Sequence, residues 1–438
     1  MKKLTAILLA AVLLFTLAAC SAKKDENNKP ETNTDAVTEA TDPTEGTTAP
    51  AEKEENTFTA VTVIDNEYCK IEVTGLKEDL LGTVLSVTAE NKTEDKSLYF
   101  LTEDCSINGV SVESIFAENV TAGNKTKSDI RFLDDALTEN GITRYSDIEI
   151  TFRVYDGEDW TGDDLEKKTV HIYPYGEDKA ERFSKEEKST DIPVFSNGEV
   201  SATVIGYGED ELYDYYVSFY LENKSADTDY TFDVSTLAAN GVEIISTAAF
   251  IIPAGKMGLE KCYISESQLS KSGITDFSDI FFTMGAFEAD NWEAEYVAKQ
   301  SVHVYPKGQE NAVPFVREAE PEDKIIADND KVTIIVTGLS KNEDLDSQDL
   351  CFYFVNKTDK EIMFTIEDVS VNGYMMDPFF ATAVHPGFSK FADTSWYEDE
   401  LSDHGIDKIT EIEFTMIARD ANDWDAEDIL NEKVIYNP

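Results

Sequence analysis

The sequence has few basic residues. Its 438 residues include 37 Lys and Arg against 88 Asp and Glu, which gives a formal net charge of −51 at pH 7. Binding of nucleic acids depends on Lys and Arg side chains that neutralise phosphates. We therefore expect no DNA or RNA partner, and the charge favours cationic or neutral partners such as basic proteins or envelope glycans.

Histidine and cysteine are also scarce, with four His and five Cys residues. The chain contains no His-Glu-x-x-His, Cys-x-x-Cys, Gly-x-Ser-x-Gly or phosphate-binding glycine motif. We therefore expect that the protein is not an enzyme. A disulfide between Cys69 and Cys105 is one alternative, and buried free thiols are the other, which we favour because spacing alone does not bring two side chains together.

The N-terminus lacks an apolar run long enough to span a bilayer. Residues 4–17 are largely apolar and follow Lys2 and Lys3, which is the pattern of a signal peptide. Residues 17–20 (Leu-Ala-Ala-Cys) resemble the bacterial lipobox, where cleavage precedes a cysteine that carries a diacylglyceryl thioether. This predicts a lipoprotein signal peptide at residues 1–19 and a lipidated Cys20. Two acyl chains anchor a protein stably at the extracellular face of the cell membrane. An ordinary signal peptide with an incidental Cys20 is the alternative.

A polar segment follows Cys20. Residues 21–57 contain no aromatic residue and no Leu, Ile or Met. Such a segment buries too little apolar surface to offset the entropy lost on ordering. We expect residues 20–57 to be the lipidated cysteine and a disordered tether.

The rest of the chain repeats itself. Trp160, Trp292 and Trp424 lie 132 residues apart. The same interval relates the Asn-Gly pairs at 108–109, 240–241 and 372–373, and also Leu137, Leu269 and Leu401. A period of this length is a whole domain. The boundaries predicted are 58–176 (repeat 1), 192–308 (repeat 2) and 324–438 (repeat 3), which follow one another as separate domains joined by linkers at 177–191 and 309–323.

Within each repeat the dominant period is two. Ile148, Ile150, Phe152 and Val154 alternate with residues 149, 151, 153 and 155, which is the pattern of a half-buried strand. Apolar residues occupy the matching inward positions at 280, 282, 284 and 286 and at 412, 414, 416 and 418. The Asn-Gly pairs predict hairpin turns, because type I′ turns need positive φ at both central residues. About seven short strands per repeat indicate an all-β fold of three tandem immunoglobulin-like β-sandwich domains.

One short helix is expected in each repeat. Residues 265–268 (Ser-Glu-Ser-Gln) fit a capping box, Leu269 offers a core anchor, and Gly273 stands where a glycine ends a helix. Residues 134–140 and 397–404 have the same layout.

Repeat 3 carries the clearest family likeness. Residues 368–374 (Asp-Val-Ser-Val-Asn-Gly-Tyr), followed by Gly405-Ile406 and Asp423-Trp424, resemble immunoglobulin-like domains of unknown function in secreted lipoproteins of Gram-positive bacteria. The resemblance extends over all three repeats. It implies a fold and a surface location, and it brings no known active site.

Oxygen-bearing side chains surround each repeated Trp at matching offsets. Two interpretations remain: a calcium site, because calcium takes six to eight oxygen ligands, and a solvated acidic turn, which the acidic composition favours. The residues concerned are Asp156, Glu158, Asp159 and Asp163 in repeat 1, Glu288, Asp290, Asn291 and Glu295 in repeat 2, and Asp420, Asn422, Asp423 and Glu427 in repeat 3.

Repeat 2 has aromatic residues on strand faces where repeat 1 has smaller or polar ones. The candidates for a ligand-binding surface are Tyr216, Tyr220, Phe281 and Phe287. Exposed rings of this kind stack on sugars or anchor a protein partner. Packing against the short helix or a neighbouring repeat is the alternative, and we favour it.

These observations predict a lipid-anchored extracellular protein whose three repeats act as a binding, adhesion or display module on the cell surface. A calcium-stiffened structural spacer without a ligand of its own is the alternative. A hydrolase that uses carboxylates alone is a distant third.

Overall fold

The computed structural model describes residues 58–80, 82–133, 135–159, 161–210, 214–245, 248–264, 269–291, 293–423 and 425–438. These residues fall within one compact unit. The predicted signal peptide, Cys20, the predicted tether, the predicted capping box at 265–268 and the three repeated Trp residues lie outside them. In the described ranges, no helix is long and apolar enough to cross a membrane.

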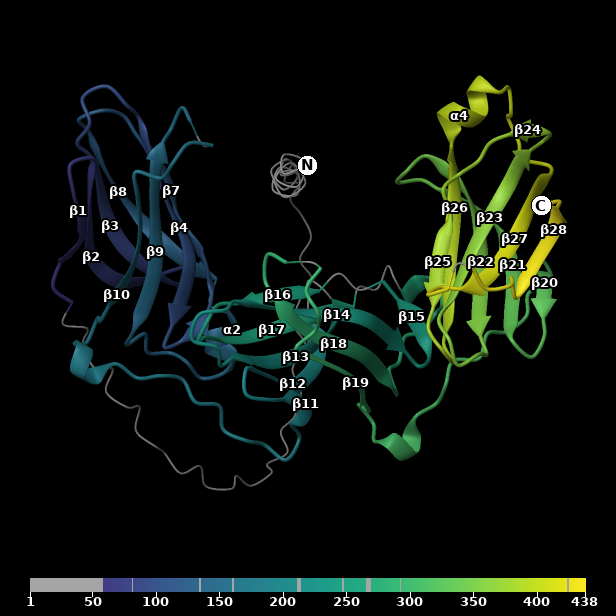
Figure 1. Cartoon of the computed structure of the whole chain (residues 1–438), viewed down its shortest axis with the longest axis horizontal. Helices are drawn as coiled ribbons and strands as arrows, with labels where there is room; N and C mark the ends of the chain where they lie inside the picture. Colours follow the sequence, from purple (N-terminus) through teal and green to yellow (C-terminus); the bar gives the residue numbers. More distant parts are fainter. Residues whose placement is uncertain are drawn as a thin grey trace, which may run out of the picture. The chain divides into compact units, whose positions relative to one another are not determined.

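The fold is all-β, as predicted, and each repeat contains two facing layers of antiparallel strands (Figure 1). In repeat 1, the first layer has the order β1 (Val61–Asp65), β2 (Cys69–Asp79), β3 (Gly82–Asn91), β8 (Lys125–Leu133) and β6 (Glu113–Ile115). The second has the order β10 (Glu166–Ile172), β9 (Ile148–Asp156), β4 (Leu98–Ile107) and β5 (Val110–Ser111), with β7 (Ala117–Val120) also on β4.

Repeats 2 and 3 use the same strand order. The strands of repeat 2 are β11 (Ile192–Ser196), β12 (Val200–Asp210), β13 (Asp214–Asn223) and β17 (Met257–Ile264), facing β19 (Ala298–Val304), β18 (Ile280–Glu288), β14 (Tyr230–Ala239), β15 (Val242–Ile244) and β16 (Ala249–Ile252). Those of repeat 3 are β20 (Lys324–Asp328), β21 (Val332–Asn342), β22 (Ser347–Asn356) and β26 (Ser389–Tyr397), facing β28 (Leu430–Tyr436), β27 (Ile412–Asp420), β23 (Ile362–Val371), β24 (Tyr374–Met375) and β25 (Ala381–Val384).

The predicted local features are present where the structure describes them. Short helices α2 (Asp135–Glu139) and α4 (Glu398–Asp403) match two of the three predicted helices, and their residues Leu137 and Leu401 are buried. In repeat 2, Leu269 is buried and Gly273 has the positive φ of a helix-ending glycine. One 3-10 turn follows each of the first two repeats: η1 (Glu177–Lys179) and η2 (Gln309–Asn311).

Alternating residues of β9, β18 and β27 form the centre of each core. Ile148, Ile150, Phe152 and Val154 are fully buried, and their counterparts in the other two repeats are buried too. Each core is a separate hydrophobic cluster. Cys69 and Cys105 are buried free thiols in the first cluster, and burial raises the pKa of Cys69 to about 11.

Neighbouring repeats are connected by strand pairing as well as by the segments 177–191 and 309–323. β5 of repeat 1 pairs in parallel with β17 of repeat 2, and β15 of repeat 2 pairs in parallel with β26 of repeat 3. Sheets therefore continue from one repeat into the next. The segments taken as linkers also pack on the preceding repeat, because Phe183 contacts the core of repeat 1 and Phe315 contacts that of repeat 2. Backbone N–H and C=O groups at the edges of these strands thus form hydrogen bonds with the neighbouring repeat.

Candidate binding cleft between repeats 2 and 3

The junction of repeats 2 and 3 begins at the Asn-Gly turn before β15. Asn240 and Gly241 have φ values of 49° and 86°, as the hairpin prediction required. The Gly241 carbonyl accepts a hydrogen bond of 3.0 Å from the backbone N–H of Ser389, and Val242 pairs with Ser389. A short strand of one repeat thus extends the sheet of the next.

Aromatic rings close the junction on one side. The rings of Phe281 and Phe388 lie 4.8 Å apart between centroids. Phe315 lies 6.0 Å from Phe391 and 6.4 Å from Tyr353. Phe281, Tyr353 and Phe391 belong to β18, β22 and β26, so strand pairing sets their positions, and Phe388 directly precedes β26.

A buried carboxylate joins the two repeats on the other side. Glu243 of β15 is 8% exposed, and its Oε1 accepts from the backbone N–H of His385 at 2.7 Å and contacts Nδ1 at 2.9 Å. The Nε2 atom of His385 lies 3.2 Å from the Thr236 hydroxyl. The hydrogen bond to Glu243 raises the pKa of His385 above its ordinary value, against the opposing effect of burial.

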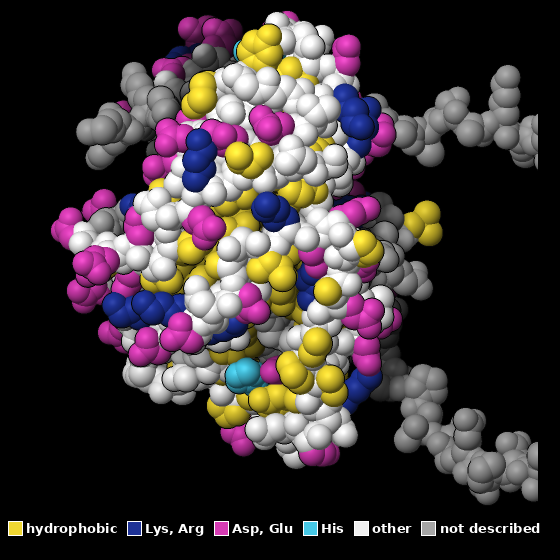
Figure 2. Space-filling view, turned by 90° about the vertical axis from the view of Figure 1, so that its right-hand side faces the viewer, with side chains coloured by type: hydrophobic (Ala, Val, Ile, Leu, Met, Phe, Trp, Pro, Cys, Tyr) yellow, Lys and Arg dark blue, Asp and Glu magenta, His cyan; other side chains and the backbone are white. Residues whose placement is uncertain are grey.

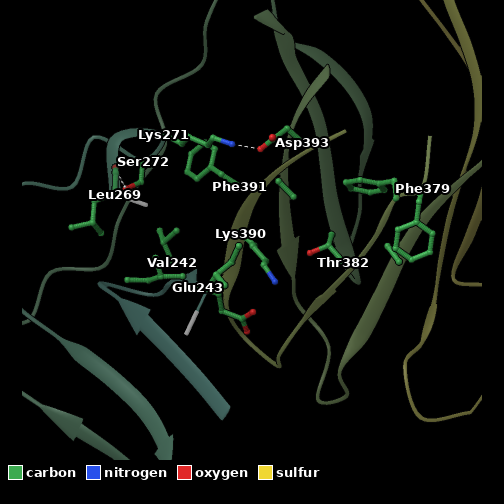
Figure 3. A pocket seen from close by; sticks show the side chains of 15 residues that line it. Val242, Glu243, Leu269, Lys271, Ser272, Phe379, Thr382, Lys390, Phe391 and Asp393 are labelled. Carbon is green, nitrogen blue, oxygen red and sulfur yellow. Dashed lines mark hydrogen bonds and ion pairs between the residues drawn. The ribbon is translucent and has the colours of Figure 1, made fainter. Parts of the chain in front are cut away.

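Side chains of both repeats line a cleft of about 520 Å³ (Figure 3). This volume is in the range of ligand sites, which often occur at domain junctions. Repeat 2 contributes Val242 to Ile245, Leu269, Lys271 and Ser272, and repeat 3 contributes Phe379 to Thr382 and Lys390 to Asp393.

The charged groups of the cleft already have partners. The Lys271 ammonium forms an ion pair with Asp393, and the Lys390 ammonium donates to the Ala383 carbonyl at 3.1 Å. Glu243 is held by His385. What the cleft presents to a ligand is mainly apolar, with Phe379 and Ile245 at 95% and 66% exposure.

One strand edge is also open at the cleft. β26 pairs with β22 along its length, whereas its other edge pairs with β15 only at Ser389 and Lys390 within the described ranges. Phe391, Ala392 and Asp393 continue that edge and line the cleft. Unpaired backbone groups beside an apolar surface are suited to an extended polypeptide segment.

The acidic residues near the repeated Trp are placed differently. Asp156 accepts from Lys96 at 2.8 Å and Asp420 from Lys360 at 2.6 Å, and these hydrogen bonds lower the pKa of both carboxyls. The other ten are exposed at or just after the ends of β9, β18 and β27: Glu158, Asp159, Asp163, Glu288, Asp290, Asn291, Glu295, Asn422, Asp423 and Glu427. Among the residues that the structure describes, no group of three or more His, Cys, Asp and Glu is placed to hold a metal ion. The calcium site and the solvated acidic turn both remain open as interpretations of these residues.

The aromatic candidates of repeat 2 all contact other side chains. Tyr220 lies 6.3 Å from Phe183, and burial raises its pKa to about 12. Phe281 packs on Phe388, as described above. Phe287 is buried beside Tyr296 at 5.5 Å, and Tyr216 lies 6.0 Å from Tyr263 with the Lys261 ammonium 4.4 Å above its ring. Tyr220 and Phe281 thus pack on chain outside repeat 2, whereas Phe287 and Tyr216 contact residues of repeat 2 itself.

Sequence reasoning missed the residues that line the cleft, although comparison of the repeats held a signal for the junction beside it. Glu149 and Lys256 form an ion pair between repeats 1 and 2. The residues 132 positions later are Phe281 and Phe388, which pack on one another. A paired change from opposite charges to two rings indicates that these positions touch across a junction.

Comparisons with known proteins add little to this geometry. No family model matches the chain, and no curated protein matches it. Among solved structures, red sea bream transglutaminase is similar over 55% of this chain and 31% of its own, at 10% identity and a TM-score of 0.17. Escherichia coli alpha-2-macroglobulin is similar over 84% of this chain and 33% of its own, at 7% identity and a TM-score of 0.16. The chain thus spans about a third of each of these proteins.

Proposed function

We propose that the chain is a lipid-anchored protein of the extracellular face of the cell membrane that binds an extended, partly apolar segment of another protein in the cleft between repeats 2 and 3. The observation that supports the binding step is the meeting of apolar side chains and an open strand edge in one cleft. An incoming strand would pair with β26 beyond Lys390 and place alternate side chains against Phe379 and Ile245.

Peptide selection tests this proposal. A library of random peptides displayed on phage is panned against the Cys20→Ser chain, and each selected peptide is measured on variants Phe379→Ser and Ile245→Ser. Both residues are exposed, so the fold should persist. We expect either substitution to weaken binding about tenfold, which corresponds to ~1.4 kcal/mol. Leu80→Ser is the matched control, because Leu80 is fully exposed in repeat 1. Peptides that bind all variants equally would contradict the cleft as the site.

A structural spacer is the second candidate, favoured by the sheets that continue through both junctions. Strand pairing between repeats would hold them together without calcium. The spacer has no ligand in the cleft, so panning would then recover no peptide whose binding depends on Phe379 or Ile245.

A further inference from the structure

The three repeats each carry a short strand directly after an Asn-Gly turn. These strands are β5, β15 and β24, and their first residues, Val110, Val242 and Tyr374, lie 132 positions apart. The turns share one backbone geometry, with φ at Asn between 49° and 53° and φ at Gly between 82° and 86°. The three strands are therefore equivalent parts of the fold.

Two of these strands dock on the next repeat in the same way. The Gly109 carbonyl accepts from the Met257 N–H at 3.0 Å, and the Gly241 carbonyl accepts from the Ser389 N–H at 3.0 Å. Val110 and Val242 are buried. Two residues beyond each donor, Leu259 and Phe391 pack against the core of the preceding repeat.

The third strand lacks such a neighbour in the described part of the chain. Tyr374 is 50% exposed and Met375 is 65% exposed. No backbone N–H of the described residues donates to the Gly373 carbonyl. Exposed hydrophobic side chains stand among acidic ones on the side of the molecule that Figure 2 displays. β24 thus pairs with β23 along one edge, whereas its other edge is open and its side chains are exposed.

An ion pair accompanies each docked strand. Glu139, at the end of α2, pairs with Lys261 at 2.8 Å, and Lys271 pairs with Asp393. Lys261 and Asp393 each lie four residues beyond the N–H donor of their junction. The residue equivalent to Glu139 and Lys271 in repeat 3 is Asp403, which is exposed at the end of α4. Since the equivalent residue pairs with an opposite charge at both other junctions, we expect Asp403 to pair with a Lys or Arg side chain.

We propose that β24 docks in parallel on the edge strand of another β-sandwich protein. One residue of that edge strand would donate its backbone N–H to the Gly373 carbonyl, and the residue four positions further along would be Lys or Arg. The site is independent of the cleft between repeats 2 and 3. It repeats an interface that the chain already forms twice, with the charge of Asp403 selecting the partner.

The same rule excludes a second copy of this chain. The equivalent strand in repeat 1 is β8, which pairs with β6 only at residues 131–133. Its residues outside that pairing include Lys125, Lys127 and Asp129, which correspond to Met257, Leu259 and Lys261. Asp129 would face Asp403, and Lys127 replaces the apolar contact. Charged residues at this edge block strand addition. The unmodified chain should therefore not associate with a second copy through β24 and β8.

A second copy of the chain can serve as the docking partner in a test, once substitutions give β8 an apolar contact and give residues 129 and 403 opposite charges. The variant Asp403→Lys with Lys127→Leu, in the Cys20→Ser background, restores opposite charges with Asp129 and an apolar contact. We expect head-to-tail association by sedimentation velocity, at least about tenfold tighter than for Lys127→Leu alone. Adding Asp129→Asn should weaken it, and adding Met375→Pro, which breaks β24, should abolish it.

Near-ultraviolet circular dichroism of each variant checks that the repeats stay folded. A variant with Asp403→Lys and Lys127→Leu that stays monomeric while folded would overturn the proposal. Association that survives Met375→Pro would overturn it as well, because the contact would then lie elsewhere. Neither result bears on peptide binding in the cleft, so the two proposals fail separately.

Discussion

Glu139 of repeat 1 and Lys261 of repeat 2 form an ion pair of 2.8 Å, and at the next junction the acidic and basic residues have exchanged places. There the equivalent positions are Lys271 and Asp393, which also pair. The charges at each junction thus favour the repeat that follows in the chain. If repeat 1 docked on repeat 3 instead, Glu139 would lie against Asp393, and the two negative charges would repel each other. Like charges at such positions act against the wrong pairing.

Reversing the charge of either Glu139 or Lys261 should lower the free energy of unfolding slightly, and reversing both should restore it. Glu139→Lys or Lys261→Glu alone should lower the apparent free energy of unfolding by about 0.5–1 kcal/mol, because the pair is partly exposed. The double variant should recover most of this loss. Urea unfolding followed by tryptophan fluorescence measures it, and additive losses in the double variant would show that the two side chains do not interact.

Stability should fall as pH rises through neutrality. The hydrogen bond that Glu243 accepts from His385 raises the pKa of His385, and burial together with the Glu113 charge raises the pKa of Glu260 to about 7. A folded-state pKa above the unfolded value means that the proton stabilises the fold at low pH and that this stabilisation is lost as pH rises through the folded pKa. Glu361 and Lys390 also face His385, with opposite effects on its pKa.

Thermal unfolding between pH 5.5 and 8.5 measures this effect. His385→Gln and Glu260→Gln should each flatten the pH profile, and the double variant should flatten it most. A profile that rises through neutrality would contradict the assignment. At acid pH the sign reverses for Asp156 and Asp420, whose lowered pKa values mean that their stabilisation is lost as they become protonated.

Replacement of Cys20 should release the protein from the membrane. Cys20→Ser removes the thiol that would carry the diacylglyceryl group, so the chain should leave the membrane fraction and lose incorporation of a labelled fatty acid. Ser21→Ala is the matched control and should change neither. A membrane-bound Cys20→Ser chain would show that another segment holds it.

Calcium should leave the melting temperature unchanged. Asp156 and Asp420 already pair with lysines, and the neighbouring oxygen ligands are exposed. Melting is compared in EDTA and in millimolar calcium at constant ionic strength. A bound ion at about 100 times its dissociation constant would add ~2.7 kcal/mol and raise the melting temperature by several degrees. Such a rise, lost in Glu288→Gln, would establish the calcium site instead.

The local pattern of the sequence determined the strands, the Asn-Gly turns and two short helices. Alternation at Ile148, Ile150 and Phe152 decides which side chains face a core, and positive φ at Asn108 and Gly109 decides the turn. Both are properties of residues close together in the chain, so no distant contact is needed to predict them.

Only the tertiary structure decided where the short strands after those turns dock. The backbone groups of β5 and β15 can pair with any open edge, so their sequences do not specify the strand of the next repeat that they join. The cleft follows from that choice, because it forms where β15 ends and the edge of β26 continues. Its lining residues lie more than 100 positions apart, from Val242 to Asp393, and become neighbours only when the sheets of two repeats join.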